Sequence, residues 1–224
     1  MTDRYCRFCQ APVDQPFVDL GSTPLANAYL TEADLARPEP SYPLRAFVCT
    51  QCWLVQADSF VPPEDIFSHY AYFSSYSDSW VEHARRFTEM ARRRFGLDST
   101  SHVIEVASND GYLLKHFVSA GVPVLGIEPA GNVAEVARAI GVPTEARFFG
   151  RETAADLVAR GLSADLVIGN NVLAHVPDIN DFVGGFARVL KPDGVISLEF
   201  PHLLRLIEGV QFDTVYHEHF YYLS

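Results

Sequence analysis

Four cysteines stand in two close pairs, Cys6/Cys9 and Cys49/Cys52, with 39 residues between the pairs. The two-residue gap within each pair lets both sulfurs of a tight turn reach one metal ion, so the two pairs together predict a tetrahedral four-thiolate zinc site. Disulfides and a redox Cys-x-x-Cys motif are the alternatives, but a redox motif needs only one pair. Because four cysteine ligands leave no coordination position open, we expect a structural Zn2+ ion.

Polar residues also follow three predicted strands. The segment from Glu105 to Gly111 reads Glu-Val-Ala-Ser-Asn-Asp-Gly, a second strand ends at Glu128, and a third ends in Asn170 and Asn171. In parallel sheets, ligands bind at the carboxyl ends of the strands, where the strand order reverses. The candidate cofactor-binding residues are Glu105, Ala107, Asn109, Asp110, Gly111, Glu128, Asn170 and Asn171.

The chemistry of these residues disfavours a dinucleotide. The Gly-x-Gly-x-x-Gly fingerprint is missing, and Asp110 stands where a pyrophosphate would lie. S-adenosylmethionine carries a sulfonium and an ammonium group, which acidic side chains such as Glu105 and Asp110 suit. Glu128, 23 residues after Glu105, is placed to accept hydrogen bonds from ribose hydroxyls. The alternative is that Glu105 and Asp110 only cap the start of a helix and are solvated there.

The sequence Tyr216-His217-Glu218-His219 near the carboxyl end is a third candidate for chemistry. An imidazole has a pKa near working pH and can remove a proton, while phenol or imidazole donors can stabilise an oxyanion. Two alternatives exist for these residues, a second metal site and a packing role. The His-Glu-x-His spacing differs from the His-Glu-x-x-His pattern that puts two imidazoles on one helix face, which disfavours a second metal, and the histidines could instead pack under a loop.

The elements that must position these groups form an alternating pattern from residue 102 onward, which predicts an α/β fold with a parallel sheet covered by helices on both faces. A helix over 80–95, capped by Asp78 or Ser79, precedes this pattern. The predicted strands are 102–107, 123–128, 143–148, 164–170 and 195–200, and the predicted helices are 111–120, 132–140, 151–160 and 180–190.

The chain divides into three predicted segments. Short apolar strands between Pro- and Gly-rich turns around the cysteines predict a zinc ribbon. The segment after it, rich in proline, serine and tyrosine, is read as a connection in which Tyr70, Tyr72 and Tyr76 either pack between the domains, which we favour, or form a lid of phenol groups. The predicted boundaries are 1–58 for the ribbon, 59–79 for the linker or lid and 80–224 for the cofactor-binding domain.

Composition excludes several classes of function. The chain of 224 residues has 17 Lys and Arg against 28 Asp and Glu, a net charge of −11, which disfavours binding to nucleic acids or anionic membranes. No apolar run is long enough to cross a bilayer, and we expect no signal peptide, because no apolar stretch follows a basic head at the start of the sequence. We therefore expect a cytoplasmic protein whose cysteines stay reduced and which acts on a small molecule.

Together these motifs closely resemble the nucleotide-sugar C-methyltransferases. The resemblance runs through the four cysteines, Tyr70–Ser75, Glu105–Gly111, Asn170–His175 and Phe212–Phe220. It implies an S-adenosylmethionine-dependent enzyme that methylates the carbon next to the 4-keto group of a deoxysugar carried on a nucleoside diphosphate, usually dTDP. It also implies that His219 is the general base and that Tyr72, His175, Tyr216 and Glu218 line the sugar pocket.

This chain is shorter than members of that family. We expect a Rossmann-like class I methyltransferase domain that is incomplete at its carboxyl end, with the strand at 195–200 left as a sheet edge. A missing carboxyl-terminal domain would then hold the rest of the nucleotide-sugar site, and the activity of the 224-residue piece alone stays open. The alternatives are an S-adenosylmethionine-dependent O- or N-methyltransferase of another small metabolite and a non-catalytic module that binds the cofactor or a partner.

Overall fold

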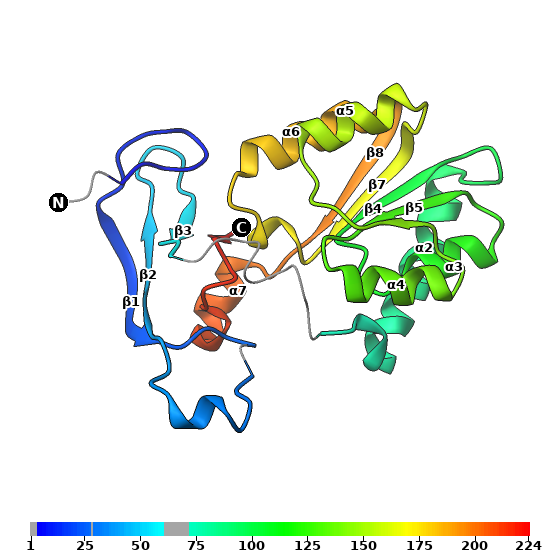
Figure 1. Ribbon diagram of the computed structural model, residues 1–224. Coiled ribbons are helices and arrows are strands. Elements are labelled where there is room, and N and C mark those ends of the chain that lie inside the picture. The colour runs from blue at the N-terminus through cyan, green and yellow to red at the C-terminus, as the bar shows by residue number, and fades with distance from the viewer. Residues whose placement is uncertain (1–3, 28, 61–71) are drawn as a thin grey trace. The chain divides into compact units, whose positions relative to one another are not determined.

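The computed structural model describes residues 4–27, 29–60 and 72–224, and the chain forms two units with a sheet each (Figure 1). Unit 1 comprises Met1–Asp65, Leu173–Ile179 and Phe200–Ser224, and unit 2 comprises Ile66–Val172 and Asn180–Glu199. No helix in the described part of the chain is long and apolar enough to cross a membrane.

Unit 2 is built on a five-stranded parallel sheet in the order β6-β5-β4-β7-β8. Its strands are β4 (Val103–Val106), β5 (Val124–Ile127), β6 (Thr144–Glu145), β7 (Ala164–Asn170) and β8 (Leu190–Glu199). The strand order reverses between β4 and β7, so the loops after these two strands flank the switch point where such sheets bind ligands.

Helices cover both faces of this sheet (Figure 1). They are α2 (Asp78–Phe95), α3 (Leu114–Ser119) and α4 (Gly131–Ala139) on one face, and α5 (Arg151–Ala159) and α6 (Ile179–Val189) on the other. The predicted α/β class is confirmed. The predicted cap of α2 was wrong by one or two residues, because the hydroxyl of Ser77 accepts the hydrogen bond from the Trp80 amide at 3.3 Å.

Coverage on both faces explains the apolar strands. Every residue of β4 and β5 is buried, and apart from Glu105 and Gly126 these residues are Val, Ile and Leu, as is typical of parallel strands covered on both faces. By contrast, β8 ends the sheet among the described residues, and most of its residues are only half-buried. This agrees with the sheet edge predicted for residues 195–200.

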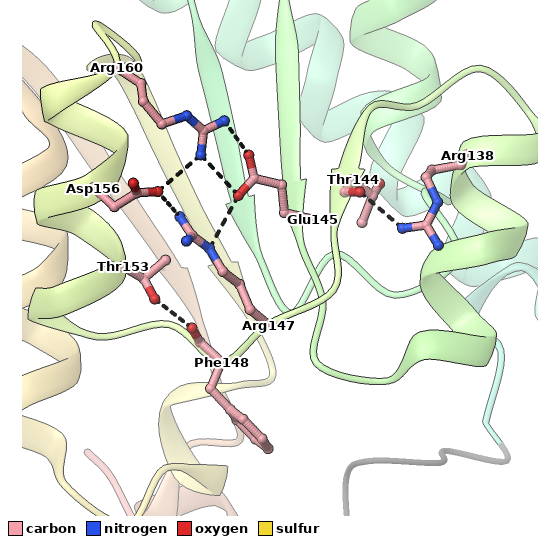
Figure 2. Close-up of polar contacts among 8 residues, drawn as sticks. All are labelled: Arg138, Thr144, Glu145, Arg147, Phe148, Thr153, Asp156 and Arg160. Carbon is pink, nitrogen blue, oxygen red and sulfur yellow. Dashed lines mark hydrogen bonds and ion pairs between the residues drawn. The ribbon is translucent and has the colours of Figure 1, made fainter.

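The opposite edge is held by a network of ion pairs between β6 and α5 (Figure 2). Arg160 lies 2.5 Å from Glu145 and 3.0 Å from Asp156, and Arg147 lies 2.7 Å from Asp156 and 3.1 Å from Glu145. Two guanidinium groups thus share two carboxylates around a strand of only two residues. A network of this kind gives a short edge strand support that isolated surface pairs rarely provide.

Unit 1 contains an antiparallel sheet in the order β1-β2-β3-β9. Its strands are β1 (Gln15–Thr23), β2 (Tyr42–Val48), β3 (Val55–Ala57) and β9 (Tyr221–Tyr222). The helix α7 (Leu203–Glu208) contributes Leu203 and Leu206 to a small core with Val55 and Tyr222. The described residues also form the short 3-10 turns η1 (Asp34–Ala36), η2 (Ser74–Tyr76), η3 (Leu173–His175) and η4 (Phe212–Thr214).

The tail of the chain therefore contacts the amino-terminal segment. The boundaries predicted from the sequence, 1–58, 59–79 and 80–224, follow chain order, whereas contacts group residues 200–224 with residues 1–65 because β9 continues the sheet of β1 to β3. Of the predicted linker, residues 61–71, including Tyr70, lie outside the described residues.

Candidate functional site

The four cysteine sulfurs of unit 1 converge, all lying within 4.8 Å of one another. Cys6 Sγ lies 3.6 Å from Cys52 Sγ, and Cys9 Sγ lies 3.6 Å from Cys49 Sγ. A tetrahedral zinc ion with bonds of about 2.3 Å to each sulfur requires separations of about 3.8 Å. The four thiolates therefore fit the predicted zinc ion.

The loop after β4 has an unusual backbone. Ala107 has a φ of 55°, Asn109 a φ of 49° and Gly111 a φ of 79°, so three of five consecutive residues adopt the left-handed region. Non-glycine residues rarely adopt this conformation, and such strain concentrates at functional sites. At Gly111 the conformation is not the only constraint, because an added Cβ would lie 3.0 Å from Val142 Cγ2.

Glu128, just after β5, fixes this loop. Its Oε2 accepts a hydrogen bond from the Asn109 amide and its Oε1 accepts one from the Ala130 amide, both at 2.9 Å. Burial raises the pKa of Glu128, and these two hydrogen bonds oppose the shift. Since each carboxylate oxygen has a second lone pair, Glu128 can still accept hydrogen bonds from a ligand.

Two further carboxyl groups are buried beside the same loop. Both oxygens of Glu105 and one oxygen of Asp110 are buried without a hydrogen-bond partner among the described residues. Burial raises the pKa of Glu105 well above its usual value, and the charges of Glu128 and Asp110 add to this shift. An environment with excess negative charge and unused acceptors suits a cationic ligand.

The Tyr- and Ser-rich segment before α2 is tied to the loop. Asn109 Oδ1 accepts a hydrogen bond from the Ser74 amide at 2.8 Å, and its Nδ2 donates to the Tyr72 carbonyl at 3.2 Å. Asp110 Oδ2 accepts a hydrogen bond from the Ser75 amide at 3.1 Å. Two predicted cofactor-binding side chains thus anchor the segment that carries Tyr72.

The end of β7 completes the polar edge of unit 2. Asn170 is buried and hydrogen-bonds the side chain of Tyr112, whose pKa burial raises well above its usual value. Asn171, exposed and with a φ of 50°, donates its amide to the Glu199 carbonyl at 2.7 Å. Tyr112 was missed from the sequence, although its place directly after the Asn-Asp-Gly turn was a usable signal.

In unit 1, the imidazole of His219 is held in one tautomer. Its Nδ1 lies 2.9 Å from the Thr214 carbonyl oxygen, which can only accept, so Nδ1 carries the hydrogen. Its Nε2 lies 3.0 Å from the Tyr216 hydroxyl and presents a lone pair to it. Burial lowers the pKa of His219, which favours the neutral ring with its lone pair on Nε2.

Other ionisable groups surround this ring. The His175 ring centroid lies 4.6 Å from that of His219, and burial, with a smaller contribution from His219, lowers the pKa of His175 to about 3. Burial and the charge of Glu218 raise the pKa of Tyr216 to about 12. Glu218 is 2% exposed, and its Oε1 accepts a hydrogen bond from Asn27 Nδ2 at 2.8 Å.

Not every residue of the tail takes part. His217 Nε2 lies 3.3 Å from the Tyr42 carbonyl oxygen and 3.2 Å from that of Pro43, which makes it a structural contact to β2. Within the described ranges, the four cysteines are the one group of three or more His, Cys, Asp or Glu side chains arranged to hold a metal ion.

The structure therefore gathers the predicted residues into three clusters. The four cysteines form one; His175, Tyr216, Glu218 and His219 form a second in unit 1; and the cofactor-binding candidates with Tyr72 form a third in unit 2. Asn27 and the carbonyl of Thr214 were missed. No sequence signal pointed to Asn27, since 191 positions separate it from Glu218.

Comparisons with known proteins match both parts of the chain to described domains. A family model described as a methyltransferase domain matches residues 80–224, and one described as a zinc binding domain matches residues 6–67. C-methyltransferase NovU of Streptomyces niveus is 38% identical over 98% of this chain, and the chain covers 52% of NovU. The ubiquinone biosynthesis O-methyltransferase of Bartonella bacilliformis is 27% identical over 43% of this chain, with 39% of that protein covered.

Among solved structures, the PH0226 protein of Pyrococcus horikoshii is 17% identical with a TM-score of 0.49, and the match covers 69% of this chain and 72% of that one. The chain thus spans about half or less of the curated relatives above. The predicted S-adenosylmethionine-binding fold and the predicted zinc-binding domain are confirmed.

Proposed function

This chain belongs to the methyltransferase-domain family, and from that membership we propose that it is an S-adenosylmethionine-dependent C-methyltransferase acting on a 4-keto deoxysugar carried on a nucleoside diphosphate. The similarity to NovU, itself a C-methyltransferase, supports carbon as the acceptor. The sugar nucleotide, with dTDP as the expected carrier, rests on the resemblance of the sequence motifs. We propose a cytoplasmic setting for this reaction.

The observation that carries the proposal is the state of His219. Methylation at carbon requires a base, because a sugar C–H bond is not a nucleophile until its proton is removed. The Thr214 carbonyl directs the proton of His219 to Nδ1 and leaves Nε2 as a base. Methyl transfer to an oxygen or nitrogen does not require this imidazole to remove a proton from carbon.

The chain's own residues then account for each proton. His219 Nε2 takes the proton from the carbon next to the ketone and becomes an imidazolium, and the ketone becomes an enolate. Tyr216 can transfer its hydrogen bond from Nε2 to the enolate oxygen, which stabilises the developing charge. When bound, S-adenosylmethionine supplies an electrophilic methyl carbon, whose transfer to the enolate carbon leaves a neutral thioether. The imidazolium finally releases its proton to solvent.

Unit 2 supplies the binding groups in this proposal. Glu105 and Asp110 offer negative charge to the sulfonium and ammonium groups of the cofactor, and Glu128 accepts hydrogen bonds from its ribose. The zinc ion, with four cysteine ligands, has no open position for a substrate and acts structurally.

Substitution of His219 tests the proposal. His219→Asn should lower methyl transfer by about 10²- to 10⁴-fold, because the base is lost, and should leave the Kd for S-adenosylmethionine within about twofold. It should also abolish the exchange of solvent deuterium into the sugar at the carbon next to the ketone. His202→Asn is the matched control, since His202 is an exposed histidine of the same unit.

The alternatives give different results. An unchanged rate in His219→Asn removes this residue from the mechanism and favours methylation of an oxygen or nitrogen. A wild-type protein that binds no cofactor in a calorimeter is a non-catalytic module, and the proposal then fails as a whole.

A further inference from the structure

We propose that Arg7, which lies inside the first zinc-binding turn, is a positioning residue that couples the zinc site to the tail carrying His219. The coupling of zinc to the tail stands on contacts within unit 1 alone. Its consequence for catalysis rests on the proposed function, in which His219 is the base.

Arg7 joins the first zinc turn to two strands. Its Nη2 donates to the Ala57 carbonyl at 2.6 Å and its Nη1 approaches the Phe220 carbonyl at 3.4 Å, while its amide donates to Gln56 Oε1 at 3.1 Å. The guanidinium carbon also lies 5.6 Å from the ring centroids of both Phe220 and Tyr221. One side chain thus holds the end of β3 and the start of β9 together by hydrogen bonds and cation–π contacts.

The strand that Arg7 holds needs such support. β9 has only two residues, which pair with Gln56 and Val55 of β3, and one further hydrogen bond runs from the Ala57 amide to the Phe220 carbonyl at 3.0 Å. A pairing this short is marginal without packing against other groups. Slippage by one residue would also turn each side chain to the opposite face.

The same strand sets the place of the catalytic candidates. Phe220 directly follows His219, and its amide donates to the Ala174 carbonyl at 2.7 Å, next to His175. The Tyr221 hydroxyl donates to the Pro177 carbonyl at 2.7 Å. Residues 220 and 221 therefore anchor both the tail and the turn that carries His175.

Zinc acts on Arg7 through the backbone of the turn. Cys6 and Cys9 flank Arg7 in the chain, and the turn is closed by a hydrogen bond from the Gln10 amide to the Cys6 carbonyl at 2.9 Å. Bound zinc fixes both sulfurs and hence the backbone between them. A Zn2+ ion with four thiolates also carries a net charge of −2, which favours a guanidinium nearby. Loss of zinc should free Arg7 and loosen the strand that it holds.

Hydrogen exchange of the zinc-loaded full chain tests this coupling. Arg7→Met should keep one zinc per chain and should raise the exchange rates of the Ala57, Phe220 and Tyr222 amides at least tenfold, with unit 2 and the Kd for S-adenosylmethionine unchanged. Arg45→Met is the matched control, because Arg45 is a guanidinium of the same unit that pairs instead with Asp58 at 3.0 Å. Arg7→Lys, which can reach one carbonyl, should restore part of the protection.

A second arm removes zinc from the wild-type chain with a chelator. The tail amides should then exchange faster, and those of unit 2 should not. Tail amides that stay protected in zinc-loaded Arg7→Met, or after zinc removal, overturn the proposal. Failure of the proposed function gives a different result: the wild-type chain shows normal protection of its tail amides but transfers no methyl group. If both hold, Arg7→Met should lower kcat at least tenfold.

Discussion

At the scale of single residues, β4, the loop after it and the end of β5 hold carboxyl groups in an environment that penalises their charge. Glu105 is fully buried, Asp110 and Glu128 are nearly so, and the pKa values of Glu105 and Glu128 are raised. Buried charges are costly unless something compensates them. A sulfonium and an ammonium group would provide that compensation and would return these pKa values toward their usual range.

This gives a prediction for the pH dependence of cofactor binding. Because a cation favours the ionised carboxylates, binding of S-adenosylmethionine should release protons and should tighten as pH rises through the raised pKa values of the free protein. Calorimetry in two buffers of different ionisation enthalpy measures the protons released. S-adenosylhomocysteine, which has no sulfonium, should release fewer, and equal release by both ligands would contradict the assignment.

Asn27 gives a second prediction at this scale. Its side chain donates to a carboxylate that is 2% exposed, so Asn27→Ala should lower the free energy of unfolding by about 1–3 kcal/mol and turnover by about tenfold. Asn27→Asp should lower both further, because it also places a second carboxylate beside Glu218. Denaturant titration and initial rates measure these effects, and two variants indistinguishable from wild type would refute the role.

At the scale of elements, the sequence predicted what is local. The buried runs of β4 and β5 and the amphipathic pattern of α2 placed these elements to within two residues, because side-chain period and burial are properties of the segment itself. The start of β8 at Leu190, five residues before the predicted start, was missed. So was β9, since two residues carry no period and their pairing with β3 depends on contacts distant in sequence.

The loop after β4 supports a prediction with an internal control. Gly111→Ala should cost about 1–3 kcal/mol of unfolding free energy and weaken cofactor binding, because a Cβ there meets Val142 at 3.0 Å at a φ of 79°. Gly121→Ala carries the same kind of backbone penalty at a φ of 74° with nothing within 4 Å. It should cost about 1 kcal/mol and leave binding unchanged. Equal losses in both variants would show that the contact with Val142 has no effect.

At the scale of the whole molecule, the chain passes between its units more than once. Residues 173–179 and 200–224 belong to unit 1, and the segment between them, 180–199, belongs to unit 2. Domain boundaries drawn in chain order do not describe this grouping. It arises from the pairing of β9 with β3 and from contacts of Phe220 and Tyr221 with residues near His175. The candidate base His219 thus belongs to a unit assembled from three separate stretches of the chain, which chain order does not predict.

The two units should respond differently to acid. In unit 1, burial lowers the pKa values of His175 and His219 below 6.5, so their stabilising contribution is present above pH 6.5 and is lost as pH falls below that value. Protonation of the cysteine thiolates weakens zinc binding in the same direction. In unit 2, the raised pKa values of Glu105 and Glu128 favour the folded state at low pH, and this contribution is lost as pH rises through those values.

Hydrogen exchange of β2 and β7 amides at pH 5.5 and pH 7.5, corrected for intrinsic rates, measures this difference. Protection of β2 should fall at least tenfold more than protection of β7 on acidification. His102 and His116 of unit 2 have lowered pKa values and oppose this difference, but both are only half-buried. Parallel loss of protection in both strands would mean that the buried histidines and the zinc thiolates do not set the acid stability of unit 1.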